Sequence, residues 1–224
     1  MLCSQCPNKI HIRTQVLPEP NPKAKYVIVG EAPWKTEFLQ KKYFVGEAGR
    51  HLWRALEQMD FKRKDFFIDN IVKCMVKDPT ETMINCCKQS VFDTLESMPN
   101  KKLILLLGGV AFEAFDLDHR GITFNSGLVF WSDRFDCAIL PCIHPASVLY
   151  DKKKEELFNL SISFMLYARI TIETFGSLKV LSNEESRELR LAKQKLKDTQ
   201  WGKELFSHRG ESIFANFSTE PVQD

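Results

Sequence analysis

Short apolar runs alternate with longer amphipathic segments along the first three quarters of the chain. Apolar runs of this length, several of them closed by glycine or proline, predict buried strands; they cover residues 26–30, 66–72, 103–107 and 138–140. Apolar residues that recur three and four positions apart predict helices; these segments cover residues 46–59, 80–98, 109–115 and 154–171.

Short apolar strands that alternate with helices are typical of a parallel sheet covered by helices on both faces. We therefore predict an α/β fold with a central four-stranded parallel sheet in a three-layer arrangement. Ligands of such sheets bind at the carboxyl ends of the strands. Polar residues gather there, because Glu31 follows the first run, Asn70 lies in the second, and His144 follows the fourth.

Composition narrows the class of protein without naming a partner. The chain has 224 residues, of which 44% are hydrophobic and 27% charged, which predicts one folded domain with an appended segment. The longest apolar run is too short to cross a bilayer, and the first residues do not resemble a secretion signal. We expect a cytoplasmic protein, prokaryotic or viral, that is not secreted and has no membrane partner. The net charge of +2 is too small to indicate nucleic-acid binding.

The character of the chain changes near residue 180. Residues 182–185 resemble a helix-capping box, and a charged stretch with few apolar residues follows them. We predict a domain over residues 1–179 and a charged C-terminal extension over 180–224, which could bind a protein partner.

Four residues at or near the predicted strand ends could together bind a nucleobase. Phe44 offers an apolar face for stacking, and Asn70 offers an acceptor and donors that suit a base edge. His144 could stabilise a carbonyl oxygen that gains negative charge, and Glu31 could orient a water molecule. Each residue taken alone is more often structural. In one pocket, the four would suit a flipped-out pyrimidine and cleavage of its glycosidic bond.

Five motifs follow one another in an order and spacing typical of one family. They are Gly30-Glu31-Ala32-Pro33, Tyr43-Phe44-Val45-Gly46-Glu47-Ala48-Gly49, Asn70-Ile71-Val72-Lys73-Cys74, Leu107-Gly108 and His144-Pro145-Ala146-Ser147. With these motifs, residues 1–171 resemble the uracil-DNA glycosylase superfamily, most of all its iron–sulfur family 4 branch. The resemblance implies the three-layer fold of that family. It also implies removal of uracil from single- or double-stranded DNA, by hydrolysis of the N-glycosidic bond, in base excision repair.

The resemblance also implies roles for individual residues. Phe44 would stack on uracil, Asn70 would read its polar edge, and the backbone of Ala32 would line the water site. The catalytic residues would be Glu31, beside the attacking water, and His144, which supports the leaving base. DNA contacts are implied for the segment after His144, at Pro145, Ser147, Leu149 and Lys152. Leu149 and Tyr150 lie in the segment that resembles the loop that wedges into the duplex. The lysine run at Lys152 could equally be a solvated helix start.

The seven cysteines are odd in number and scattered, which favours a metal site with additional buried thiols over disulfides. The similar family carries a [4Fe–4S] cluster. The resemblance places Cys3, Cys6 and Cys74 among its ligands, with either Cys86 or Cys87 as the fourth. Cys87 fits the helical pattern around it better. Four thiolates could equally hold zinc.

Two departures from the family pattern keep other functions open. Trp34 stands where the family has glycine, and Tyr43 stands where it has proline. A bulky residue at the Trp34 turn is expected to narrow the pocket or shift the loop. One alternative function is a weak or inactive glycosylase-fold subunit that binds DNA in a replication or repair assembly. Another is a zinc-containing nucleotide-binding protein.

Overall fold

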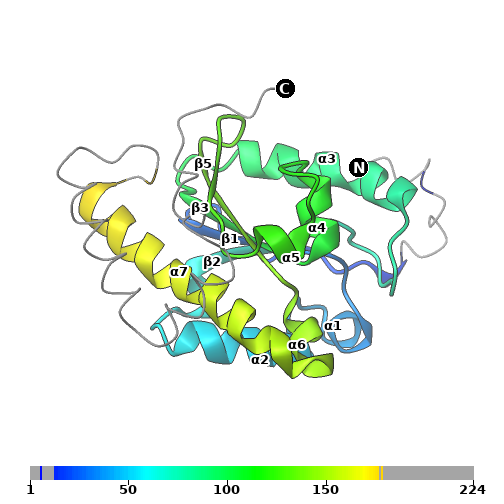
Figure 1. Ribbon diagram of the computed structural model, residues 1–224. Coiled ribbons are helices and arrows are strands. Elements are labelled where there is room, and N and C mark those ends of the chain that lie inside the picture. Colours follow the sequence, from blue (N-terminus) through cyan, green and yellow to red (C-terminus); the bar gives the residue numbers. More distant parts are fainter. Residues whose placement is uncertain (1–5, 7–12, 177, 179–224) are drawn as a thin grey trace.

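Helices cover both faces of one sheet (Figure 1). The computed structural model describes Cys6, residues 13–176 and Leu178. Within these residues the strand order is β2-β1-β3-β5-β4. The strands are β1 (Tyr26–Gly30), β2 (Phe66–Asn70), β3 (Leu103–Leu107), β4 (Phe130–Ser132) and β5 (Cys137–Cys142). The α-helices are α1 (Lys35–Gln40), α2 (Glu47–Glu57), α3 (Glu81–Glu96), α4 (Gly109–Ala114), α5 (Ile122–Asn125), α6 (Pro145–Tyr150) and α7 (Glu155–Phe175), and two 3-10 turns are η2 (Arg63–Asp65) and η3 (Lys152–Lys154).

The α/β prediction is confirmed, but the sheet has one strand more than predicted. As expected from their apolar runs, β1, β2, β3 and β5 pair in parallel. The additional strand, β4, pairs antiparallel with β5 at the edge of the sheet. The sequence pattern does not predict β4 because the strand has only three residues, all half-buried, and therefore shows no apolar run.

Each strand sends alternate side chains to opposite faces of the sheet. In β1, Tyr26 and Ile28 belong to the core shared with α2 and α7, whereas Val27 and Val29 belong to the core shared with α3 and α4. Figure 1 shows these two groups of helices on opposite sides of the sheet. Because both faces are covered, the strands are continuously apolar, which explains the runs in the sequence.

The strand order reverses direction between β1 and β3. From β1 the chain proceeds to β2 on one side of the sheet, and it then returns to β3 and β5 on the other side. Ligand sites of open parallel sheets lie at such a switch point, outside the carboxyl ends of the strands. Glu31 directly follows β1, and Gly108 directly follows β3, so both lie at this place.

β5 contributes two thiols to the interior of the sheet. Cys137 and Cys142 have no exposed surface. Burial raises the pKa of both thiols, that of Cys137 to about 12. Two intervening strands, β1 and β3, separate β5 from β2, the strand that precedes Cys74.

The predicted domain division falls partly outside the described residues. The extension predicted over 180–224 lies wholly outside them, as does part of the domain predicted over 1–179. Of the helices that the structure describes, none combines the length and the apolar character needed to cross a membrane.

A methyl group at Gly49 should displace the turn at Phe44. A Cβ atom at Gly49 would lie 2.2 Å from the carbonyl carbon and oxygen of Phe44. We expect Gly49→Ala to lower the free energy of unfolding by about 1–3 kcal/mol, measured by urea denaturation. Gly46→Ser is the control, because Gly46 is the N-cap of α2 and a Cβ there meets nothing closer than Thr36, at 4.0 Å. Equal stability of the two variants would contradict the prediction.

Candidate active site

The turn that carries Phe44 has a backbone conformation that few side chains adopt. Phe44 has a φ of 51°, in the left-handed region. Its N–H donates to the carboxylate of Glu37, which also accepts from the N–H of Trp34 at 2.9 Å. Its carbonyl oxygen accepts from Nε1 of Trp53 at 3.1 Å. These bonds tie the turn to α1 and α2 and fix the direction of the Phe44 ring.

The Phe44 ring and the Asn70 amide meet over Gly30. A Cβ atom at Gly30 would lie 2.4 Å from Oδ1 of Asn70 and 2.6 Å from Cζ of Phe44. Gly30 and Asn70 are register partners on β1 and β2. Asn70 and Phe44 are both buried, with only 2% and 4% of their surface exposed. The structure thus brings together the two residues predicted to read a base and to stack on it, and any side chain at Gly30 would occupy the space they share.

A buried ion pair fixes the backbone of Asn70. Nζ of Lys73 donates to Oδ1 of Asp69 and to the Asn70 carbonyl oxygen, the latter at 2.8 Å. Oδ1 of Asp69 also accepts from the N–H of Asn70 at 2.7 Å. Both charges are almost fully buried, so each offsets the lost hydration of the other. The sequence analysis missed this pair. The signal that could have found it is a carboxylate inside an apolar run with a lysine four positions later.

His144 stands at the start of α6 and presents one ring nitrogen as a donor. Its Nδ1 accepts from the N–H of Ala146 at 3.2 Å, which leaves the proton of the neutral ring on Nε2. Burial lowers the pKa of His144 to about 4, so the ring is neutral at pH 7. The ring packs on Gly108, where a Cβ atom would lie 3.1 Å from Cβ of His144. Three strand spacings, or roughly 14 Å, separate the ends of β5 and β2 in the sheet.

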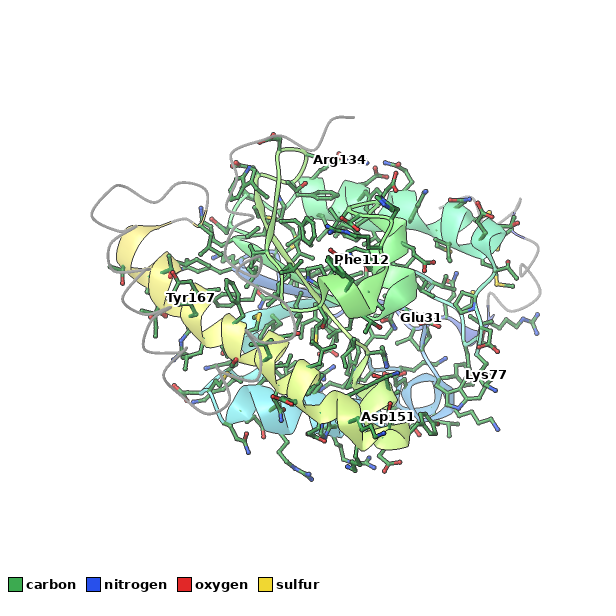
Figure 2. The ribbon with its side chains drawn as sticks, in the orientation of Figure 1. Glu31, Lys77, Phe112, Arg134, Asp151 and Tyr167 are labelled. Atoms are coloured by element: carbon green, nitrogen blue, oxygen red, sulfur yellow. The ribbon has the colours of Figure 1, made fainter. Side chains whose placement is uncertain are left out.

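Glu31 lies between these two ends of the site, directly after β1. It is half-buried, and burial raises the pKa of its carboxyl group above the ordinary value. The like charges of Asp78 and Glu113 raise this pKa further. Ala32 follows and packs against the core on the α3 side of the sheet. Figure 2 shows Glu31 and Asp151, the residue after α6, toward the same end of the molecule.

Comparison with known proteins identifies the family. The model of the uracil DNA glycosylase superfamily matches residues 17–164. The chain belongs to this superfamily. The Type-4 uracil-DNA glycosylase of Archaeoglobus fulgidus is 35% identical over 146 residues, which are 61% of this chain and 72% of that protein. The Type-4 uracil-DNA glycosylase of Saccharolobus solfataricus is 30% identical over 187 residues, 77% of this chain and 86% of that protein. That of Thermotoga maritima is 27% identical over 159 residues.

The His-Pro segment of this superfamily member forms a short helix, α6, that the sequence analysis did not predict. Pro145 is buried at the first helical position, where a missing N–H costs nothing. The Ser147 hydroxyl donates to the His144 carbonyl oxygen at 2.7 Å and so closes the first turn. Lys152 follows in η3. Its side chain is 79% exposed and lies 3.9 Å from Glu155, so the ammonium group remains accessible.

The two residues of the predicted wedge segment, Leu149 and Tyr150, differ in exposure. Leu149 is half-buried, whereas Tyr150 is 91% exposed. The sequence pattern could not separate the two neighbours, because their exposure depends on how α6 packs against α2 and α7.

The segment before β1 runs beside one predicted metal ligand. The N–H of Val16 donates to the Lys73 carbonyl oxygen at 3.0 Å, and Gln15 forms an antiparallel bridge with Cys74. This pairing places Gln15 and Val16 beside the segment that carries Cys74. The predicted ligand Cys3 lies outside the described residues.

The other predicted cysteine ligands are buried. Cys6, Cys74 and Cys87 are 8%, 7% and 5% exposed, and Cys86 is half-buried. The thiols of Cys74 and Cys87 both act electrostatically on the hydroxyl group of Tyr43, whose pKa is raised mainly by burial. Cys74 and Cys87 therefore both lie within electrostatic range of the Tyr43 hydroxyl group. Among the described residues, no three potential ligands lie close enough together to hold a metal ion.

The two departures from the family pattern have different surroundings. Trp34 has an extended backbone with φ of −112°, which any residue adopts, and it is 45% exposed. Tyr43 is fully buried, and its hydroxyl group donates to the Val16 carbonyl oxygen. Its own carbonyl oxygen accepts from Nη2 of Arg63 at 2.6 Å. Tyr43 is therefore a core residue that anchors the turn from behind.

Proposed function

We propose that this protein is a monofunctional uracil-DNA glycosylase, which removes uracil from single- or double-stranded DNA as the first step of base excision repair. The observation that carries the proposal is the meeting of the Phe44 ring and the Asn70 amide over Gly30. Membership of the superfamily and the printed names of the Type-4 relatives support it. We place the activity in the cytoplasm of a prokaryote or of a virus-infected host.

The uracil is bound after it leaves the base stack. Flipping costs a few kcal/mol, and contacts in the pocket offset this cost. The Phe44 ring stacks on the base, and the Asn70 amide pairs with its polar edge. The hydrogen bonds around Phe44 and the Asp69–Lys73 pair hold both groups in place before DNA arrives.

Cleavage requires that uracil leave with the electron pair of the N-glycosidic bond. The Nε2–H of His144 donates to the uracil carbonyl oxygen on which negative charge develops, and the neutral ring suits this role. Glu31 accepts a hydrogen bond from the water that adds to C1′, and the backbone of Ala32 lines the place of this water. The products are free uracil and an abasic site.

DNA is held by the segment that follows His144. The turn formed by Pro145 and Ser147 holds the DNA backbone near the site, and Lys152 contacts a phosphate. Leu149 supports the wedge from below. We assign the inserting side chain to Tyr150, because it is the exposed residue of the pair.

We assign a [4Fe–4S] cluster to Cys3, Cys6, Cys74 and Cys87. The donor chemistry fits, because Cys6, Cys74 and Cys87 are buried and no disulfide joins the described cysteines. Cys87 suits the fourth position better than Cys86, because it is buried, as Cys6 and Cys74 are, whereas Cys86 is half-buried. When bound, the cluster supplies a structural cross-link between the N-terminus and α3.

The activity is tested with an end-labelled oligonucleotide that contains one uracil, followed by alkaline strand scission. We expect cleavage by the parent protein, and a rate lower by about 100-fold or more for His144→Ala, because a preorganised donor is lost. The excision rate of Asn70→Ala should be lower than that of the parent by a similar factor. His119→Ala is the control, since His119 is exposed in the turn between α4 and α5 and has no role in the proposed mechanism. A folded parent without excision would favour the inactive DNA-binding subunit, and His144→Ala as fast as the parent would remove the site assignment.

The pH dependence of excision should report Glu31. Glu31 must be ionised to accept from water, so the rate rises with pH through its pKa, which lies above 4.5. His144 stays neutral down to about 4 and does not set this limb. We expect Asp78→Asn to move the acid limb of single-turnover rates to lower pH, because it removes a like charge, while Asp93→Asn on α3 leaves it in place. If the acid limb of the pH–rate profile stays in place in Asp78→Asn, the result argues against the role of Glu31.

The cluster assignment predicts that Cys87, and not its neighbour Cys86, is needed to bind the cluster. Cys87→Ser should lose most of the bound iron and sulfide and the visible absorption, because oxygen is a poorer ligand for the cluster than a thiolate. Cys86→Ser should retain them. Metal analysis that finds zinc in the parent, or loss of iron in Cys86→Ser alone, would refute the assignment.

A further inference from the structure

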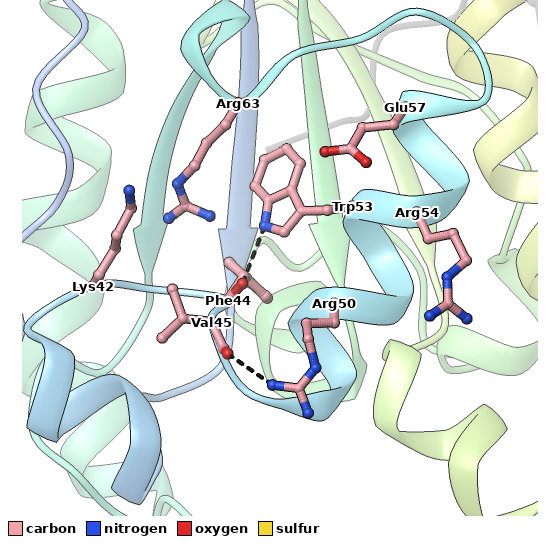
Figure 3. Close-up of a pocket in the computed structure, with 8 residues that line it drawn as sticks. All are labelled: Lys42, Phe44, Val45, Arg50, Trp53, Arg54, Glu57 and Arg63. Carbon is pink, nitrogen blue, oxygen red and sulfur yellow. Dashed lines mark hydrogen bonds between the residues drawn. The ribbon is translucent and has the colours of Figure 1, made fainter.

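A hollow lies along α2, beside the Phe44 turn. It encloses about 450 Å³ and is open to solvent (Figure 3). We call it the basic groove, because its lining includes four cationic side chains and one carboxylate, those of Lys42, Arg50, Arg54, Arg63 and Glu57. Figure 3 shows these side chains arranged around the indole ring of Trp53.

Most of the positive charge in the basic groove is not neutralised. Arg63 forms an ion pair with Glu19. Among the ion pairs of the described residues, none includes Lys42, Arg50 or Arg54. Arg50 and Arg54 stand one helical turn apart on the same face of α2, where like charges repel each other and destabilise a helix. An anion in the groove would remove this repulsion.

The basic groove shares a wall with the proposed uracil site. The ring of Phe44 faces Gly30 and Asn70, while its carbonyl oxygen faces the groove and accepts from Nε1 of Trp53. On its other side α2 packs against α6, which begins beside His144. The groove therefore lies next to both elements that would hold the flipped nucleotide.

The chemistry of the groove suits phosphates better than bases. The N–H of Trp53 is already donated to Phe44, and the guanidinium group of Arg63 lies 4.8 Å from the centre of the indole ring. The exposed groups that remain are Lys42, Arg50 and Arg54, which attract phosphates without regard to sequence.

We propose that the basic groove holds backbone phosphates of the DNA strand that carries the uracil, so that the DNA contact surface extends from α6 across α2. This inference rests on the proposed function and adds a contact to it. Arg50 and Arg54 bind two phosphates outside the flipped nucleotide, and Lys42 adds to the field. The contribution is to affinity for long strands, whatever their sequence.

The test compares Arg50→Ala/Arg54→Ala with Lys23→Ala/Lys25→Ala. The control pair is also exposed and lines a hollow of similar size, about 390 Å³, at the opposite end of β1. Dissociation constants are measured by fluorescence anisotropy over a range of salt concentrations, with labelled single strands that lack uracil. Loss of two phosphate contacts should make the slope of log K against log salt shallower by about 1.4 and weaken binding about tenfold at low salt.

Uracil release is measured in parallel on a uracil-centred trinucleotide and on a long strand. The groove variant should lose more activity on the long strand than on the trinucleotide, because only the long strand reaches the groove. An unchanged salt slope, or an equal change in the Lys23/Lys25 control, would overturn the proposal. Absence of uracil release by the parent would count against the proposed function, and the anisotropy slopes would still decide the groove.

Discussion

The left-handed backbone at Phe44 is the constraint on which the rest of the site depends. A non-glycine residue in this conformation costs of order 1–3 kcal/mol and persists only when its surroundings enforce it. Here Glu37 binds the N–H, Trp53 binds the carbonyl oxygen, and Gly49 lets α2 pass close to the backbone. Because the turn is fixed, the ring faces the sheet and the carbonyl faces solvent. One residue thereby forms a wall of both the proposed base site and the basic groove.

The surroundings of each ionisable group near the site suit the role proposed for it. The buried ion pair of Asp69 and Lys73 holds the backbone of Asn70 and takes no part in the proposed reaction. His144 is kept neutral by burial, so it can donate a hydrogen bond without drawing in a counterion. Burial and the like charges of Asp78 and Glu113 raise the pKa of Glu31, the carboxyl group proposed to orient the water. Unpaired cations are found farther out, at Arg50 and Arg54, where solvent reduces the cost of their repulsion.

The layered fold could be predicted because burial on both faces leaves a direct trace in the sequence. Continuous apolar runs mark β1, β2, β3 and β5, and the residues that close them mark the edge where Glu31, Asn70 and His144 lie. β4 could not be predicted, because three half-buried residues leave no trace. α6 could not be predicted either, since Pro145 masks a helix that begins at it. The difference between Leu149 and Tyr150, and the unpaired state of Arg50 and Arg54, depend on tertiary packing, which a linear pattern does not contain.

The two thiols of β5 bear on how the protein would respond to oxidants. Oxidation and alkylation proceed through the thiolate and require access. Cys137 and Cys142 have raised pKa values and no exposed surface, so they remain protonated and shielded in the folded state. Reagents that attack thiols in the native protein would therefore modify the cysteines outside β5 first. Among the described cysteines Cys86 is the most accessible, so damage by oxidants would begin there, while the centre of the sheet stays intact.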